Sequence, residues 1–260
     1  MTDRNFDDLA SRLQRNVYQG LKGSIRQQVI QRDLQEFLPN SASGLRILDA
    51  GGGQGQMACY LAAQGHQVTL CDISGNMLTL AQAEFDRHPF RYPVTLYHGS
   101  IQDFSRQNQT PFDVITCHAV LEWVSTPQDI LRHCRDQLTT NGILSVAYYN
   151  FDGLIYKNLL RKNFKKVRKE QWYGDQGSLT PTTPVQRDDF LGWINKLGLS
   201  VLCESGIRVF HDYILDPIAR NSDHKEILEM ELQFSRQAPF KYMGRYSHFL
   251  LSAANADQKS

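Results

Sequence analysis

Several features common in membrane and secreted proteins are missing from this chain of 260 residues. No apolar run approaches the roughly 18 residues that a membrane-spanning helix needs. The N-terminal stretch "MTDRNFDDLASRL" is acidic and amphipathic, whereas a secretory signal has a basic start followed by an apolar core. These absences predict a soluble, cytoplasmic protein with no membrane partner.

Cysteine is scarce, and no two cysteines have the Cys-x-x-Cys spacing of a zinc or redox site. The five are Cys59, Cys71, Cys117, Cys134 and Cys203. An odd number argues against a disulfide framework, and most of them lie in apolar runs. We therefore expect reduced thiols and no metal site. The sequence also lacks a convincing Ser/His/Asp or Cys/His arrangement for nucleophilic catalysis.

Apolar runs of strand length alternate with helical patterns. Strands are predicted over 45–51, 67–72, 94–100, 112–118 and 142–150, with helices over 56–64, 75–88 and 127–138. A helix–strand unit over 187–204, a helix over 224–234 and a last strand over 245–254 follow. This alternation predicts an α/β fold with a doubly wound, mostly parallel sheet and right-handed crossovers.

A glycine-rich turn, "LDAGGGQG", follows the first predicted strand. Gly51, Gly53 and Gly55 let the backbone approach a ligand, and the next helix offers free N–H groups. Asp72 ends the second predicted strand, where a carboxylate can bind a ribose diol. A dinucleotide or S-adenosylmethionine fits this pattern. Asp49 and the early third glycine favour S-adenosylmethionine over the Gly-x-Gly-x-x-Gly of dinucleotide folds, and a plain turn is the remaining alternative.

Two further residues are candidates for the same crevice. His118 ends the fourth predicted strand, on the side where ligands bind in such sheets; a capping or core histidine is the alternative. Arg26 lies in the N-terminal helical pattern and can either be solvated or grip a cofactor carboxylate as a bidentate fork.

With these residues in hand, a family resemblance extends over nearly the whole chain. The stretches "LDAGGGQGQ", "GHQVTLCDIS", "HAVLEWV", "GIRVFHDY" and "GRYSH" together resemble the bacterial tRNA 5-carboxymethoxyuridine methyltransferase family. The resemblance implies a class I methyltransferase fold, with an antiparallel seventh strand, and S-adenosylmethionine as cofactor. It also implies methyl esterification of the 5-carboxymethoxyuridine carboxylate at wobble position 34 of tRNA. Matching positions imply cofactor contacts at Arg26, Gly51, Gly52, Asp72, Ile101 and His118, with Ile101 acting through its backbone.

The chain is predicted to form a single domain, 1–260. A helical cap covers 1–40, and its helical pattern over 6–38 is interrupted near Gly20 and Gly23. A cofactor-binding half covers 45–150. A substrate-side half covers 151–260 and contains a basic insertion at 153–173.

A carboxylate acceptor is already ionised at neutral pH, since a carboxylic acid titrates near ~4, so the reaction requires no general base. We expect Arg208, His211 or Tyr213 in "RVFHDY" to orient this carboxylate by one or two hydrogen bonds. The alternative for this stretch is a strand with one polar face.

The stretch "YKNLLRKNFKKVRKE" concentrates positive charge. Its seven basic residues are Lys157, Arg161, Lys162, Lys165, Lys166, Arg168 and Lys169, and removing them from the net charge of +1 leaves −6. The resemblance makes a tRNA anticodon arm the predicted partner, bound through its phosphates. The alternative is a helix packed by a stripe of Leu160, Phe164 and Val167 with its lysines in water.

Two other functions stay open at this point. One is a methyltransferase acting on a small metabolite, because the glycine turn and Asp72 do not discriminate between acceptors. The other is a non-catalytic tRNA-binding protein that retains the cofactor fold. A dinucleotide oxidoreductase disagrees with both the glycine spacing and the downstream motifs.

Overall fold

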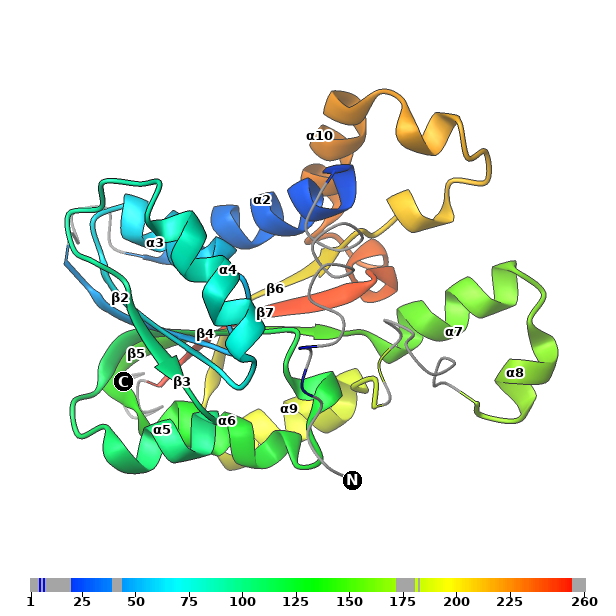
Figure 1. The fold of residues 1–260 in the computed structure, drawn as a ribbon. Coiled ribbons are helices and arrows are strands. Elements are labelled where there is room, and N and C mark those ends of the chain that lie inside the picture. The colour runs from blue at the N-terminus through cyan, green and yellow to red at the C-terminus, as the bar shows by residue number, and fades with distance from the viewer. Residues whose placement is uncertain are drawn as a thin grey trace, which may run out of the picture.

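A seven-stranded sheet with the order β3-β2-β1-β4-β5-β7-β6 organises the computed structural model (Figure 1). The structure describes residues 5, 7, 20–38, 44–171, 181 and 183–253. Strands β1 to β5 pair in parallel, and β7 runs antiparallel to both β5 and β6. The prediction of a doubly wound, mostly parallel sheet with an antiparallel seventh strand is confirmed.

The predicted strands and helices lie close to those observed. The strands are β1 Arg46–Ala50, β2 Gln67–Asp72, β3 Thr95–His98, β4 Phe112–His118, β5 Leu138–Tyr149, β6 Ser200–Ile207 and β7 Tyr246–Ser252. The helices are α2 Gly20–Phe37, α3 Gln56–Ala63, α4 Gly75–Phe85, α5 Ile101–Gln107, α6 Pro127–Asp136, α7 Phe151–Leu160, α8 Phe164–Arg168, α9 Arg187–Lys196 and α10 His224–Phe234. The fifth strand begins earlier than predicted, because "LTTN" pairs before the apolar run starts.

Helices cover both faces of the sheet and create two separate cores. On one face, α2, α3, α4 and α10 pack against strand residues such as Ile47. On the other face, α5, α6 and α9 pack against strand residues such as Leu48. Adjacent residues of a strand point to opposite faces, so an apolar strand without polar alternation is what a doubly covered sheet requires.

Helix α2 begins at Gly20, one of the two glycines at which the predicted helical pattern is interrupted, and Gly20 has a positive φ of 73°. The helix runs on through Gly23, which is buried, so the second glycine does not interrupt it. The part of the predicted helix that precedes α2 lies outside the described residues, apart from Asn5 and Asp7.

The basic stretch forms two short helices rather than one, so the alternative interpretation of this stretch, a single helix packed by an apolar stripe, is wrong. Helices α7 and α8 are separated where Lys162 takes a positive φ of 57°. Leu160 and Phe164 are 45% and 46% exposed, so they do not pack α8 onto the core. The two helices project from the carboxyl end of β5, at the right of Figure 1.

Candidate functional site

The glycine turn after β1 has a backbone that other residues adopt only with strain. Gly51, Gly53 and Gly55 have φ of 71°, 56° and 74°, a region that favours glycine. Gly52 has a different reason: a Cβ there would lie 2.5 Å from Oδ2 of Asp49. The turn is thereby held close against the ends of the central strands.

A pocket lies between this turn and α2. Its lining residues are Gly23, Arg26, Gln27, Ile30, Asp49, Gly51, Gly52, Gln56, Met57 and His118. Asp49 accepts a hydrogen bond from Thr116 Oγ1 at 2.7 Å, while its Oδ2 is buried with no hydrogen-bond partner among the described residues. Burial raises the pKa of Asp49 to about 6. The pocket therefore brings Arg26, the glycine turn and His118 together, as predicted from positions far apart in sequence.

Asp72 ends β2 and ties two loops together. Its Oδ2 accepts from the Gly53 backbone N–H and its Oδ1 from the Ser74 backbone N–H, both at 2.8 Å. Asp7, which the sequence did not single out, lies at the same place. Its Oδ1 accepts from the Ser74 hydroxyl. The same oxygen accepts from the Asn76 backbone N–H, at 3.2 Å. An N-terminal residue thus docks beside the glycine turn.

Ile101 opens α5 and is 7% exposed, and the Ser100 side chain caps this helix. Its neighbour Asp103 is exposed and bonds Ser100 and Arg106. Asp103 is therefore engaged within its own helix.

Two titratable groups near Arg26 have shifted pKa values, His118, which lines the pocket, and Glu122. Burial lowers the pKa of His118 well below its usual range, so its ring is neutral at physiological pH. Glu122, in the turn η2 Leu121–Trp123, is buried, and burial raises its pKa to about 7. The backbone N–H groups of Glu122 and Tyr149 and the charge of Arg26 oppose this rise without cancelling it.

These residues fit S-adenosylmethionine, the cofactor predicted from the sequence. The glycine turn lets a ligand lie close against the protein backbone. The Asp72 carboxylate lies at the end of the neighbouring strand, where a ribose diol binds. Arg26 offers a cation for the cofactor's carboxylate, and a neutral His118 avoids repulsion with its positive groups. Among the described residues, no cluster of His, Cys, Asp or Glu is arranged to hold a metal ion.

A second cluster of charges lies next to this pocket, around one carboxylate. Asp212 Oδ2 is 3.6 Å from Arg208 Nη2, 3.7 Å from Arg245 Nε and 3.9 Å from Lys157 Nζ. These side chains are between 6% and 19% exposed. The surrounding cations hold the pKa of Asp212 well below its usual range. Burial, with the charge of Arg245, lowers the pKa of Lys157 to about 7.

This cluster has more positive than negative charge, and one donor in it is unused. Arg245 Nη1 is buried and has no hydrogen-bond partner among the described residues. Buried charges are normally paired, so three cations around one carboxylate are arranged as an anion-binding site. The Tyr246 ring separates this site from the first pocket: Arg26 lies 5.4 Å from its centroid and Arg208 lies 5.5 Å from it.

Of the three residues predicted in "RVFHDY", only Arg208 belongs to the cation group of this cluster. His211 is 1% exposed, and its Nδ1 lies 3.3 Å from Asp212 Oδ1. The Tyr213 hydroxyl donates to the Met243 carbonyl at 2.7 Å, with the Gly153 carbonyl at 3.2 Å. His211 therefore supports Asp212, and Tyr213 connects this loop to the start of α7.

Glu231 of α10 anchors the same loop. Its carboxylate accepts from the backbone N–H groups of Val209, Phe210 and His211 at 2.7, 3.1 and 2.8 Å. Three such bonds hold Arg208 in its left-handed conformation, φ 58°. Sequence reasoning missed Glu231, Arg245 and the buried role of Lys157, because only the fold brings them together.

Comparisons with known proteins agree with this geometry. A model described as a methyltransferase domain matches residues 48–146. The tRNA 5-carboxymethoxyuridine methyltransferase of Escherichia coli K12 is 36% identical over 249 residues, covering 95% of each chain. The mitochondrial ubiquinone biosynthesis O-methyltransferase of Schizosaccharomyces pombe is also 36% identical, but over 109 residues that cover 42% of this chain and 39% of that one.

Solved structures give the fold. Magnesium protoporphyrin IX methyltransferase from Synechocystis, with bound S-adenosylhomocysteine, superposes with a TM-score of 0.63 at 14% identity and covers 95% of both chains. The plantazolicin methyltransferase BpumL superposes with a TM-score of 0.58 at 18% identity, covering 95% of this chain and 90% of that one.

Proposed function

Because the chain belongs to the tRNA 5-carboxymethoxyuridine methyltransferase family, we propose that it esterifies the carboxylate of 5-carboxymethoxyuridine at the wobble position of tRNA. The methyl donor is S-adenosylmethionine, the cofactor of this fold. The reaction produces the methyl ester and S-adenosylhomocysteine. With tRNA as its acceptor, the protein is expected to act in the cytoplasm. Among the described residues, no helix has the length and apolar character to cross a membrane.

One observation carries the assignment of the acceptor: a buried cluster of three cations and one carboxylate lies beside the cofactor pocket. An uncharged acceptor would leave the excess positive charge of this cluster unpaired, since Arg208 and Arg245 alone outnumber Asp212. A substrate carboxylate reduces this excess and gives the unused Nη1 of Arg245 an acceptor. The cluster therefore favours an anionic acceptor over a phenol or an amine.

The chemistry then consists mainly of positioning. The bound cofactor supplies a methyl group made electrophilic by its sulfonium. Arg208 and Arg245 orient a carboxylate oxygen that is already ionised and needs no base. Asp212 shares the same cations and so prevents them from binding the nucleophile too tightly, which matters because its charge disperses in the transition state. Tyr149 and Tyr246 help to exclude water from between the two sites.

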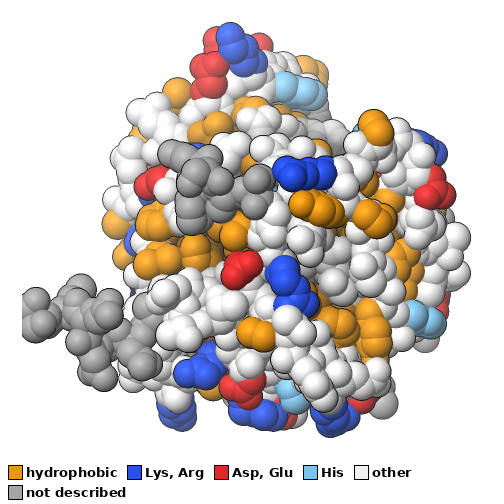
Figure 2. Space-filling view, turned by 90° about the vertical axis from the view of Figure 1, so that its left-hand side faces the viewer, with side chains coloured by type: hydrophobic (Ala, Val, Ile, Leu, Met, Phe, Trp, Pro, Cys, Tyr) orange, Lys and Arg blue, Asp and Glu red, His pale blue; other side chains and the backbone are white. Residues whose placement is uncertain are grey.

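The basic helices supply a surface for the tRNA. Lys157 belongs to the buried cluster, but the other six cations of this stretch lie on α8 or in the residues beside it. They are Arg161 and Lys162 between α7 and α8, Lys165, Lys166 and Arg168 on α8, and Lys169 after it. All but Lys166, which is partly covered, are exposed. Tyr156 and Phe164 are 40% and 46% exposed there, and aromatic rings can stack on unpaired loop bases. The opposite face, shown in Figure 2, has its Lys and Arg side chains dispersed beside Asp and Glu.

The direct test is methyl transfer from labelled S-adenosylmethionine to tRNA that carries 5-carboxymethoxyuridine. Label is expected in an alkali-sensitive ester on the wobble nucleoside, and tRNA with unmodified uridine there is the control. Label that enters only a small-metabolite extract would support the alternative, a small-molecule methyltransferase. Arg208→Ala should slow transfer by about a hundredfold, since it removes a charged hydrogen bond to the acceptor; unchanged kcat and KM would remove Arg208 from the mechanism.

A further inference from the structure

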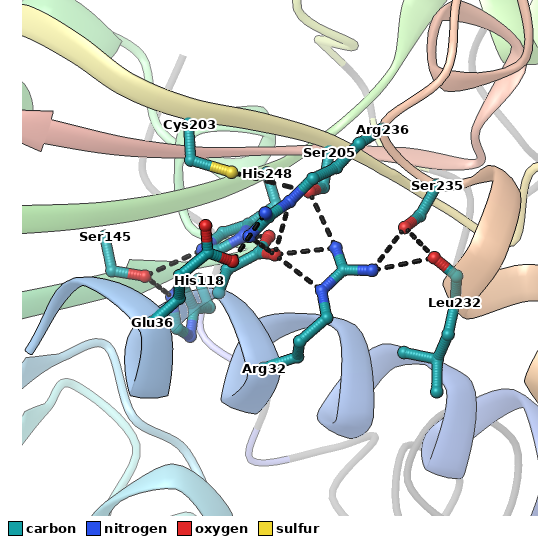
Figure 3. A network of polar contacts seen from close by, with 11 residues as sticks. Arg32, Glu36, His118, Ser145, Cys203, Ser205, Leu232, Ser235, Arg236 and His248 are labelled. Carbon is teal, nitrogen blue, oxygen red and sulfur yellow. Dashed lines mark hydrogen bonds and ion pairs between the residues drawn. The ribbon is translucent and has the colours of Figure 1, made fainter.

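A chain of buried hydrogen bonds leads from α2 across the sheet to the cofactor pocket (Figure 3). Asp33 Oδ2 lies 2.8 Å from His248 Nδ1. His248 Nε2 lies 2.9 Å from Ser145 Oγ, and the same oxygen lies 2.8 Å from His118 Nε2. Asp33, His248 and Ser145 are each 0% exposed, so water does not substitute for any of these bonds.

Each member of this chain constrains the proton of the next one. Asp33 is ionised, because the hydrogen bond from His248 and the charge of Arg32 hold its pKa well below the usual range despite burial; it can therefore only accept from His248 Nδ1–H. A neutral His248 then accepts at Nε2 from the Ser145 hydroxyl. With its only proton used there, Ser145 must accept from His118 Nε2–H. The other ring nitrogen of His118, Nδ1, is then an acceptor, and His118 lines the pocket.

Charge balance at the start of the chain favours the uncharged His248 ring. Arg32 and Arg236 both donate to Asp33 Oδ1, at 2.6 and 2.7 Å in their shortest contacts, and Arg236 also donates to Glu36 at 2.6 Å. Two guanidinium groups and two carboxylates already cancel. A proton on His248 would add an unpaired charge to a fully buried site.

We propose that Asp33, His248 and Ser145 are positioning residues that fix His118 as the Nε2–H tautomer, with Nδ1 as an acceptor for the ammonium group of the cofactor's methionine part. That group has only N–H donors, so the opposite tautomer would place donor against donor. Arg26 lines the same pocket and suits the carboxylate of the same moiety. This inference concerns the cofactor alone and stands whether or not tRNA is the acceptor.

The first test reads the tautomer directly in the cofactor-free protein. Nitrogen NMR of isotope-labelled histidine, with His118 assigned by a His118→Gln variant, should show Nε2 protonated and Nδ1 bare. Asp33→Asn should reverse the whole chain: the two arginines hold the amide oxygen at the former Oδ1, so the NH₂ donates to His248, and His118 becomes Nδ1–H. A bare Nε2 in the wild type, or an unchanged tautomer in Asp33→Asn, would overturn the proposal.

The second test uses a milder variant, because Asp33→Asn also weakens two ion pairs. Ser145→Ala removes only the middle of the chain, and His118 should then populate both tautomers. Calorimetry should show weaker binding of S-adenosylhomocysteine in proportion to the fraction of His118 that keeps the Nε2–H tautomer, about twofold if the two tautomers are equally populated. Methylthioadenosine, which lacks the amino-acid part, should bind as before, and Ser145→Thr, which restores a hydroxyl, should recover the affinity. Equal losses for both ligands would mean a merely structural role and would contradict the proposal.

Discussion

Lys157 carries a cost of burial that the rest of the basic stretch avoids. Its pKa is lowered from 10.5 to about 7, first by burial and then by Arg245. Below pH 7 the folded protein holds this buried charge at full cost. Between pH 7 and 10.5 the folded lysine is neutral while the unfolded one is still charged, so the cost declines as pH rises. The presence of Lys157 despite this destabilisation indicates that it binds an anion.

Lys157→Met is therefore expected to stabilise the protein while it damages the reaction. The apolar side chain fills similar space without a charge, so the unfolding midpoint at pH 6 should rise by at least about 2 °C, and this gain should vanish as pH approaches 10.5. Methyl transfer to modified tRNA by this variant should be slower than transfer by the wild type at pH 6. The wild-type rate should decline above pH 7, where Lys157 loses its charge, and the variant should not show this decline. Lys196→Met, on the exposed surface of α9 and outside the basic stretch, is the control; a destabilised Lys157→Met would contradict this account.

Glu122 should make the cofactor-free protein less stable as pH rises. Its pKa is raised from 4.5 to about 7 by burial, so its favourable contribution is full below pH 4.5 and is lost as pH rises through 7. Glu122→Gln should flatten the fall in unfolding free energy over this range, measured by urea titration at several pH values. Part of the pH dependence should remain in this variant, because burial also raises the pKa of Asp49, to about 6. If the unfolding free energy of Glu122→Gln falls with pH as steeply as that of the wild type, Glu122 does not cause the pH dependence.

At the scale of elements, the position of α7 decides whether Lys157 reaches the anion site. The helix begins where Gly153 meets the Gly244 backbone: a Cβ at position 153 would lie 2.4 Å from the Gly244 carbonyl oxygen. Gly153→Ala should push α7 away, lower stability by about 1–3 kcal/mol and reduce methyl transfer more than cofactor affinity. Gly192→Ala, in α9 with open space around it, should be neutral or stabilising. Similar effects of both changes would separate α7 docking from activity.

The next helix, α8, and the residues that flank it should govern RNA affinity. Replacing Lys162, Lys165, Lys166 and Lys169 with Gln is expected to weaken tRNA binding and to flatten its salt dependence by up to about 3 in log–log slope, about 0.7 for each phosphate that is no longer neutralised. Cofactor binding, measured by calorimetry, should not change. A variant with four exposed cations replaced elsewhere, Arg87, Arg106, Lys196 and Lys225, controls for net charge. Equal losses of affinity in both variants would show that α7 and α8 have no special role in binding the tRNA.

The scale of the whole molecule explains what could be predicted and what could not. Strands β2 and β4 match their predicted bounds because apolar runs between breakers are local signals. The pocket was also predictable, since the glycine turn and strand ends fix it. The chain from Asp33 to His248 spans 215 positions in sequence; His248 lies in the stretch "GRYSH", but nothing local pairs it with Asp33. Tertiary contacts alone reveal it, as they do the burial of Lys157.

The final prediction concerns the protein in its cell. If the wobble carboxylate is the acceptor, deleting the gene should remove the methyl ester from wobble nucleosides and leave the free acid in its place, as measured by mass spectrometry of digested tRNA. Complementation with the wild-type chain should restore the ester, and Arg245→Met, which removes a cation of the anion site without adding a polar group, should restore far less at equal protein level. Loss of both the ester and the acid would place the chain at an earlier step, and an unchanged nucleoside profile would reject a tRNA acceptor while leaving the cofactor site intact.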